Sequence, residues 1–304
     1  MSINSSDHHH LQLSDGAVVV LRRLGQAGRP RLVLSHGNGL AIDGYRSFWS
    51  LLAEQFELVL FDMRNHGVNP THVQDQHTFA RMTQDLHEIW PVIAKVFGAA
   101  PTVGLFHSMS AIVSIEHLAA FGPACEALVL FDPPVYPPVG HPLEAVERQD
   151  MQALASRSRR RPEAYGSPLE LAAQFSRRRA FSNWVPGAAE DLARATLRAD
   201  KASGQWVLAC PRDYEAHMYD TNDSPVPWAT LTAPLPLPVL LLGGDPLLED
   251  QSPPALLCAA MAAQGNFEYQ ALTGASHFLQ IEQPRRCADA VIRFINTNVP
   301  ACAV

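Results

Sequence analysis

Residues Thr102–Ala111 read TVGLFHSMSA. The first five form a short apolar run typical of a buried strand, and the residues after Ser108 have helical periodicity. Ser108 is therefore expected where a strand turns sharply into a helix. A serine there has two interpretations: it caps the first turn of the helix, or the turn exposes its hydroxyl group for chemistry. The choice depends on the rest of the sequence.

Apolar runs rich in Val and Leu alternate with longer helical segments along the chain. This alternation predicts an α/β fold with a mostly parallel central sheet flanked by helices. The predicted strands are 17–22, 31–35, 57–61, 102–106, 127–131, 238–242 and 268–272. The predicted sheet-covering helices are 79–96, 108–120, 254–263 and 285–296.

The alternation stops after Asp132, where DPPVYPPVGHP holds five prolines in eleven residues. Such a segment marks a boundary, because proline interrupts both helices and strands. No strand-like run returns until Leu235. We therefore predict a core made of residues 1–135 and 223–304, and an inserted helical subdomain made of residues 136–222.

Composition limits the classes of function. The chain has 304 residues, of which 47% are hydrophobic, so it can bury a full-sized core. Its 23 Lys and Arg against 30 Asp and Glu give a formal charge of −7. A chain of that sign repels phosphate backbones, so we expect no nucleic-acid partner. The sequence is compatible with a homo-oligomer.

Cysteine and histidine usage predicts no metal or other cofactor. The five cysteines form no CxxC pair and indicate free thiols in a reducing compartment. The three adjacent histidines at 8–10 are interpreted as a solvated tail. The N-terminus lacks a secretory pattern, and no apolar run approaches the ~20 residues that a membrane span needs. We therefore expect a cytoplasmic protein with no membrane partner.

Two arginine-rich runs lie inside the predicted insertion. They are SRSRRRP (Ser156–Pro162) and SRRRA (Ser176–Ala180). We interpret both as solvated helix faces, and the alternative is that they hold an anionic group of a substrate.

A glycine-rich loop follows the strand 31–35 and reads HGNG (His36–Gly39). Glycines let backbone N–H groups approach a ligand closely. We expect the N–H groups of Asn38 and Met109 to face one point beside Ser108, where they would stabilise an oxyanion. The alternative is that these glycines only form a tight turn.

Among the thirteen histidines, His277 is the best candidate base. It lies in TGASHFLQIEQP, just beyond a predicted strand, and the carboxyl ends of parallel strands share one edge of the sheet. Two carboxylates also follow strands: Asp245 in LLLGGDP and Asp132 in LVLFDPP. We favour Asp245 as the partner of His277, with Asp132 as the alternative.

Together, SHGNG, FDMRNHG (Phe61–Gly67), HSMS, GGDP and GASHFLQIEQP resemble the α/β-hydrolase-fold serine hydrolases in order and spacing. The resemblance spans Ser35–Pro284. It implies the α/β-hydrolase fold, with a nucleophile elbow at Ser108, a catalytic triad, an oxyanion hole and a helical cap domain formed by the insertion.

The resemblance also implies an enzyme of the serine esterase type. Its substrate would be a small-molecule acyl compound, an ester, lactone or thioester, cleaved through an acyl-enzyme without a cofactor. Carbon–carbon bond hydrolases, perhydrolases and acyltransferases of the same fold stay open. Epoxide hydrolases and haloalkane dehalogenases are excluded, because they need a carboxylate nucleophile where this chain has Ser108.

One departure from the family pattern motivates a second hypothesis. The residue two before the nucleophile is small in the family, and here it is Phe106, whereas Ser110 fits the pattern on the other side. The chain could therefore keep the fold as a non-catalytic ligand-binding or receptor-like protein. If it is an enzyme, specificity comes largely from the insertion, and we expect Trp184 and Tyr219 to line the substrate pocket.

Overall fold

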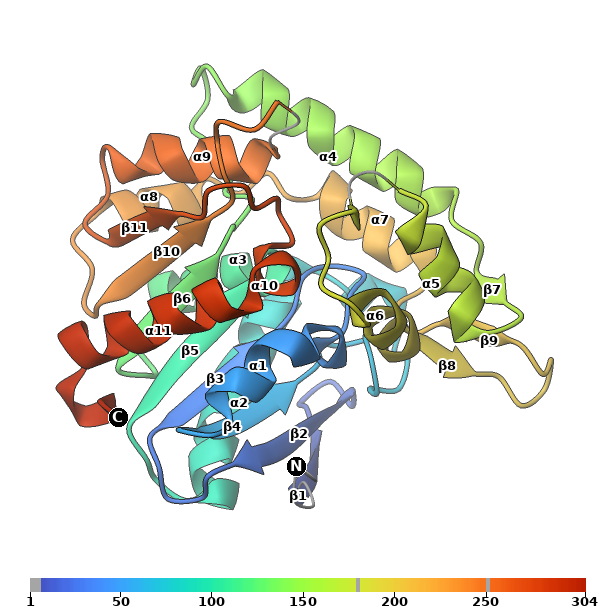
Figure 1. Cartoon of the computed structure of the whole chain (residues 1–304), viewed down its shortest axis with the longest axis horizontal. Coiled ribbons are helices and arrows are strands. Elements are labelled where there is room, and N and C mark those ends of the chain that lie inside the picture. Colours follow the sequence, from blue (N-terminus) through green and yellow to red (C-terminus); the bar gives the residue numbers. More distant parts are fainter. Residues whose placement is uncertain (1–6, 179–180, 250–251) are drawn as a thin grey trace.

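The computed structural model describes residues 7–178, 181–249 and 252–304. An eight-stranded sheet, in the order β1-β2-β4-β3-β5-β6-β10-β11, forms its centre (Figure 1). The strands from β4 to β11 pair in parallel, and β1 and β2 are antiparallel. The bounds are β1 Asp7–Gln12, β2 Val18–Gly25, β3 Arg31–Ser35, β4 Glu57–Phe61, β5 Thr102–His107, β6 Ala127–Phe131, β10 Val239–Gly243 and β11 Glu268–Ala271. The predicted, mostly parallel central sheet is confirmed.

Strand β1 corrects one interpretation of the sequence. The histidines at 8–10 belong to this edge strand, which pairs with β2, and are not a tail. His8 and His10 are exposed, whereas His9 and Leu11 are partly buried. This alternation is the strand pattern, but polar residues occupy both faces and hid it in the sequence.

Helices cover both faces of the sheet, with one apolar core under each layer. One face packs against α2 (Phe79–Phe97), α3 (Met109–Phe121), α8 (Val226–Thr232) and α9 (Pro253–Ala262). The other packs against α1 (Arg46–Leu52), α10 (Leu279–Glu282) and α11 (Pro284–Asn298). The predicted sheet-covering helices agree with α2, α3, α9 and α11 to within two residues at each end.

The chain between β6 and β10 leaves the sheet and returns to it with α8 (Figure 1). It contains the helices α4 Glu144–Arg159, α5 Pro168–Ser176, α6 Ala188–Thr196 and α7 Arg212–Asp220. It also contains a three-stranded antiparallel sheet, β7 (Ala164–Tyr165), β9 (Trp206–Leu208) and β8 (Leu197–Ala199). The expectation of a purely helical insertion is wrong here, because strands of two or three residues leave no alternating pattern.

Phe106 fits into β5 without interrupting the strand or the helix that follows. Its ring is fully buried and meets the rings of Phe61 and Trp90 edge to face. Space for the ring comes from Gly104, two residues earlier on the same face of β5. A Cβ atom at Gly104 would lie 2.6 Å from Cε2 of Phe106. The missing side chain at position 104 therefore compensates for the large one at position 106.

A buried carboxyl group lies where α4 packs near the core. The side chain of Glu147 is fully buried, and neither of its oxygens has a hydrogen-bond partner. Burial, and then the charges of Asp150 and Asp132, raise the pKa of Glu147 to about 8. Glu147 is therefore protonated in the folded protein at neutral pH.

We predict that Gly104→Ala destabilises the protein by about 1 to 3 kcal/mol, because the added methyl group overpacks the core against Phe106 and Leu128. Urea unfolding measures the loss, and Gly104→Ala combined with Phe106→Leu should recover part of it. Gly166→Ala is the control, since its Cβ atom meets nothing closer than 3.5 Å. Equal stability of the Gly104→Ala and Gly166→Ala variants would contradict this packing.

We predict that Glu147→Gln raises the free energy of unfolding, relative to the unmodified protein, by more at pH 8 than at pH 5. Glu147 in the unfolded chain ionises near 4.5, and in the folded protein near 8. The unfolded state therefore binds fewer protons between these values, and stability falls as the pH rises through them. Because Gln does not titrate, the free energy of unfolding of the variant should exceed that of the unmodified protein by roughly 2 to 4 kcal/mol more at pH 8 than at pH 5. This range follows from ~1.4 kcal/mol per pKa unit.

Thermal unfolding of the Glu147→Gln variant and the unmodified protein at both pH values measures this gain. Glu163→Gln is the control, because the carboxylate of Glu163 is largely exposed. A Tm difference that is the same at pH 5 and pH 8 would show that Glu147 does not titrate in this range.

Candidate active site

Ser108 occupies the turn between β5 and α3 in a backbone conformation that L-residues rarely adopt, with φ 53° and ψ −117°. Its N–H donates to the carbonyl oxygen of Phe131 at the end of β6. Ser110 closes the turn, since its Oγ accepts from the N–H of His107 and donates to the carbonyl oxygen of the same residue. The turn presents the Ser108 hydroxyl at the carboxyl edge of the sheet.

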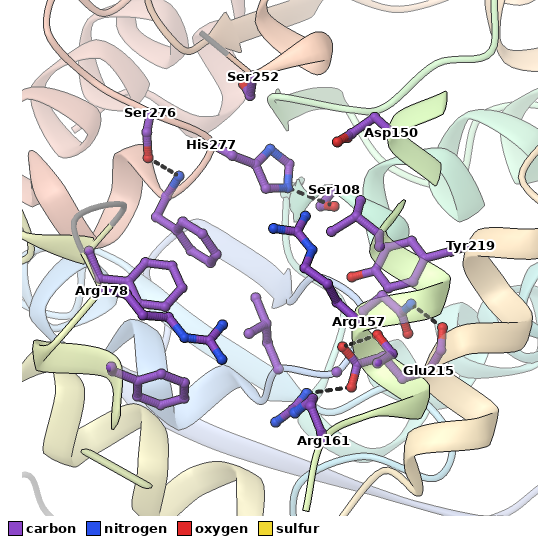
Figure 2. Close-up of a pocket in the computed structure, with 18 of the residues that line it drawn as sticks. Ser108, Asp150, Arg157, Arg161, Arg178, Glu215, Tyr219, Ser252, Ser276 and His277 are labelled. Carbon is purple, nitrogen blue, oxygen red and sulfur yellow. Dashed lines mark hydrogen bonds and ion pairs between the residues drawn. The ribbon is translucent and has the colours of Figure 1, made fainter. Parts of the chain in front are cut away.

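The imidazole of His277 connects Ser108 to a buried carboxylate. Its Nε2 lies 3.1 Å from Oγ of Ser108 (Figure 2), and its Nδ1 lies 2.8 Å from Oδ2 of Asp132. A carboxylate only accepts hydrogen bonds, so Nδ1 carries a proton and Nε2 of the neutral ring can accept from the hydroxyl group. Asp132 is fully buried and also accepts from the N–H of Gly244 and the hydroxyl of Ser252.

The preference for Asp245 as the partner of His277 is wrong, and the alternative, Asp132, makes the contact. Both oxygens of Asp245 accept from backbone N–H groups: Oδ1 from Leu247 in its own loop, and Oδ2 from Gly274 in the turn after β11. Asp245 therefore fastens the turn that precedes His277. Its side chain does not reach the imidazole.

The ring of His107 holds the backbone of His277 by a hydrogen bond, a role that the sequence did not reveal. Its Nε2 lies 2.9 Å from the carbonyl oxygen of His277, and its Nδ1 lies 2.7 Å from the hydroxyl oxygen of Tyr45. The carbonyl oxygen must accept, so Nε2 carries the proton and Nδ1 accepts from Tyr45. Complete burial, reinforced by the charge of His277, holds the pKa of His107 well below its usual value.

The loop His36–Gly39 lies against the turn at Ser108. A Cβ atom at Gly37 would lie 3.1 Å from Cβ of Ser108, so a larger residue would push the two segments apart. Asn38 is buried at the cavity, and its side-chain amide donates to the carbonyl oxygen of Glu215 on α7. Met109 is the first residue of α3, where N–H groups lack an acceptor inside the helix. Asn38 thus lines the same cavity as Ser108, and Met109 directly follows Ser108 in the chain.

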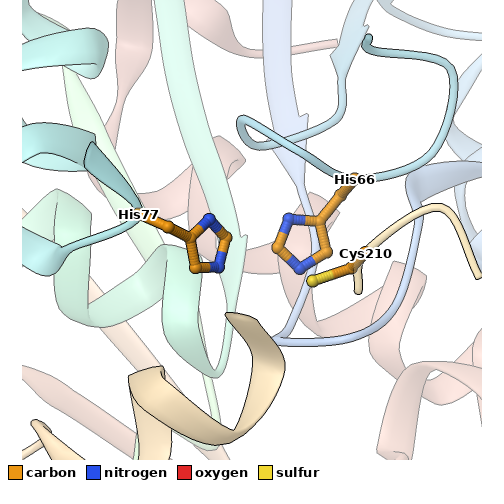
Figure 3. Close-up of side chains that lie close together, drawn as sticks. All are labelled: His66, His77 and Cys210. Carbon is orange, nitrogen blue, oxygen red and sulfur yellow. The ribbon is translucent and has the colours of Figure 1, made fainter. Parts of the chain in front are cut away.

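A histidine-rich cluster supports this loop from behind (Figure 3). The Nε2 of His66 accepts from the N–H of Gly39, and its Nδ1 donates to the carbonyl oxygen of Arg64. Ligand atoms of His66, His77 and Cys210 lie within 4.8 Å of one another, as in a metal site. Both nitrogens of His66 are already hydrogen-bonded, so a metal ion there would break one of these bonds. The two hydrogen bonds of His66 therefore support the loop at Gly39.

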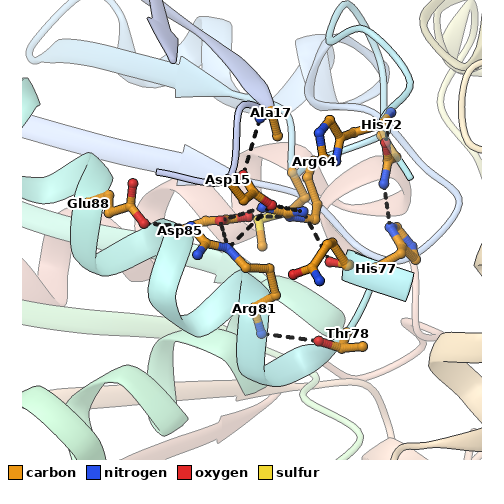
Figure 4. A network of polar contacts seen from close by, with 12 residues as sticks. Asp15, Ala17, Arg64, His72, His77, Thr78, Arg81, Asp85 and Glu88 are labelled. Carbon is orange, nitrogen blue, oxygen red and sulfur yellow. Dashed lines mark hydrogen bonds and ion pairs between the residues drawn. The ribbon is translucent and has the colours of Figure 1, made fainter. Parts of the chain in front are cut away.

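An ionic network ties the segment after β4 to α2 (Figure 4). The buried guanidinium of Arg64 binds Asp85 at 2.5 Å and Asp15 at 2.9 Å. Arg81 binds Asp85 from the adjacent turn of α2, and also Glu88. The FDMRNHG stretch is thus an anchored segment that holds His66, and through it the loop at Gly39.

Above Ser108 lies a cavity of about 1130 Å³ between the core and the insertion. Tyr219 lines it, as expected. Trp184 is not among its lining residues, so that expectation is wrong. The Trp184 ring packs behind the wall, against Phe181 and Phe278, which do face the cavity.

The first arginine run also differs from the sequence interpretation. Arg157, Arg160 and Arg161 line the cavity, whereas only Arg159 faces outward, to Asp220. In the second run Arg178 lines the cavity, and residues 179–180 lie outside the described residues. Most of the described arginines of the two runs are exposed, as expected, but four of them face the cavity and not the outer surface.

Among the described residues, no helix has the length and apolar character needed to cross a lipid bilayer.

Comparison with solved structures places the chain among hydrolases in fold. E-2-(acetamidomethylene)succinate hydrolase superposes with a TM-score of 0.78 at 16% identity, covering 96% of this chain and 100% of that one. A thermophilic esterase from Thermogutta terrifontis gives 0.67 at 17% identity, with 96% and 98% covered. A thioesterase domain from the curacin biosynthetic pathway gives 0.71 at 15% identity, with 95% and 100% covered.

Sequence comparison gives the family. An uncharacterized hydrolase of Saccharomyces cerevisiae is 30% identical over 78 residues, which are 26% of this chain and 27% of that protein. This match spans about a quarter of either chain. The model of the alpha/beta hydrolase family matches residues 32–290, which contain Ser108, Asp132 and His277. The chain therefore belongs to the alpha/beta hydrolase family.

Proposed function

We propose that this protein is a serine hydrolase that cleaves a carboxylic ester or a related acyl bond through an acyl-enzyme. The observation that carries the proposal is the continuous chain of hydrogen bonds from Oγ of Ser108 through His277 to Asp132. Nucleophilic hydrolysis needs these three parts: an alcohol, a base that takes its proton, and an acid that orients the base.

In the first step, Oγ of Ser108 attacks the acyl carbon while Nε2 of His277 takes the hydroxyl proton. The tetrahedral intermediate collapses, the bond to the alcohol oxygen breaks, and His277 returns the proton to the leaving alcohol. Water then attacks the acyl-enzyme with the same base and releases the acid and free Ser108. Asp132 stays ionised throughout and stabilises the imidazolium form of His277.

The oxyanion formed in both steps would be bound by the N–H groups of Met109 and Asn38. The dipole of α3 supports this role, because the N-terminus of a helix carries partial positive charge. The close approach of Gly37 to Ser108 supports it too, since the loop can then reach the reacting carbon. Donors fixed before the reaction lower its barrier more than mobile water does.

The insertion would act as a cap that encloses the substrate. Residues from the insertion and from the core line one cavity with Ser108 and His277, so the cap would supply most of the contacts that select the substrate. Tyr219 remains the proposed selectivity residue of the two expected from the sequence. The non-catalytic alternative was motivated by Phe106, and the space left by Gly104 for its ring favours the catalytic proposal.

We predict that Ser108→Ala lowers kcat for 4-nitrophenyl butyrate by about 10³-fold or more, because the nucleophile is lost. The variant should fold normally and should not react with a fluorophosphonate probe. Ser114→Ala is the matched control, since the hydroxyl of Ser114 bonds only within α3. Unchanged hydrolysis by folded Ser108→Ala, or equal labelling of both variants, would refute the proposal.

We predict that Asp132→Asn lowers kcat by about 10³- to 10⁴-fold, because an amide no longer holds the reactive tautomer of the imidazole. Asp245→Asn should cost less than about tenfold, because Asp245 binds only backbone N–H groups near the Gly274 turn. Steady-state kinetics on variants of matched Tm measure both. If Asp245→Asn is the more damaging change, Asp132 is not the acid.

A further inference from the structure

The face of α4 that lines the cavity carries charged side chains near the middle and near the end of the helix. Asp150, Leu154 and Arg157 follow one another at i, i+4 and i+7, which places them on one side of a helix. All three line the cavity above Ser108. Figure 2 shows Arg157 pointing into the pocket that Ser108 and His277 also line. A guanidinium group is thus built into the wall of the proposed substrate site.

The guanidinium of Arg157 forms no salt bridge with a described residue. The neighbouring Arg161 is paired with Glu215, whose other oxygen accepts from Ser158. Arg157, by contrast, makes no side-chain hydrogen bond or ion pair with any residue of 7–178, 181–249 or 252–304. It remains exposed to solvent within the cavity. Its five N–H donors are available to a ligand.

Two carboxylates that line the cavity bind residues other than Arg157. Glu215 is engaged by Arg161, and Glu282 accepts from the N–H and the hydroxyl of Ser276. Asp150 lies two turns before Arg157 and forms no salt bridge with it. Burial raises the pKa of Asp150 by more than the charge of Arg157 lowers it. Arg178 adds a second guanidinium to the cavity and forms no side-chain hydrogen bond or salt bridge with a described residue.

We propose that the substrate carries an ionised carboxyl group in addition to its ester bond, and that Arg157 binds this group inside the cavity. The inference rests on the proposed ester hydrolysis and names the substrate class. A planar guanidinium matches a carboxylate in a two-point hydrogen bond, which fixes orientation as well as charge. A doubly charged phosphate fits less well, because Asp150 and Glu215 face the same cavity.

The test compares esters that differ only in a carboxylate. One pair is 4-nitrophenyl hydrogen glutarate and 4-nitrophenyl pentanoate, which differ in the acyl part. The other is 4-butanoyloxybenzoate and its methyl ester, which differ in the alcohol part. We expect the anionic member of at least one pair to have the higher kcat/KM, mainly through a lower KM. The preference should shrink as ionic strength rises.

Variants on one helix provide the matched comparison. Arg157→Met should reduce the ratio of anionic to neutral kcat/KM by about tenfold to a hundredfold, in line with the loss of a charge-assisted hydrogen bond. Arg157→Lys should retain part of it, because it keeps the charge but not the planar fork. Arg159→Met should leave the ratio unchanged, because Arg159 faces outward to Asp220.

The outcomes separate this inference from the proposed function. If the unmodified protein hydrolyses the neutral esters but prefers neither anionic member, the carboxylate proposal is wrong and the hydrolase proposal stands. The same conclusion follows if the preference survives in folded Arg157→Met. Stronger inhibition by inorganic phosphate than by glutarate would also overturn the choice of carboxylate. If no ester is hydrolysed, the proposed function itself fails.

Discussion

The left-handed backbone of Ser108 imposes its geometry on the segments around it. A turn with φ 53° brings the end of β5, the start of α3 and the loop after β3 into direct contact. Each neighbour therefore has to be small or turned aside. Gly37 leaves no room for a side chain beside Ser108, and Phe106 turns its ring over Gly104. The loop at Gly39 is then held from behind by His66, which the Arg64 network fixes in turn.

The parts of the site that the sequence predicted are those set by local rules. Ser108 follows an apolar run and precedes a helix, and His277 lies in a short loop beyond a strand, so both could be placed at the same edge. The acid could not be decided in this way. Asp132 and Asp245 follow β6 and β10, which are adjacent parallel strands, and so they end at the same level of the sheet. The outcome depends on their hydrogen-bond partners in three dimensions, because the Gly274 turn occupies Asp245 and leaves Asp132 for His277.

The insertion was harder to predict, because its residues face three environments: the cavity, the packed interior and the outer surface. An aromatic side chain such as Trp184 gives the same signal whether it lines a cavity or packs behind one. The direction of the side chains is equally hard to predict in the arginine runs, because helical spacing alone does not tell which arginine points inward. Arg157 and Arg159 are two residues apart on α4, and so they face different sides. Only the packing of α4 against α7 and the core reveals which side is the inner one.

Helix α4 links the two ends of the proposed site electrostatically. Glu147 lies near Asp132 at one end, and Arg157 faces the cavity at the other. A protonated Glu147 adds no charge beside Asp132, so the carboxylate that orients His277 remains the dominant negative charge there. An ionised Glu147 would place a second negative charge in the same buried region, where it would repel the carboxylate of Asp132. Because Glu147 is buried and neutral, Asp132 remains the charged carboxylate that accepts the hydrogen bond from Nδ1 of His277, which is the arrangement that the proposed mechanism requires.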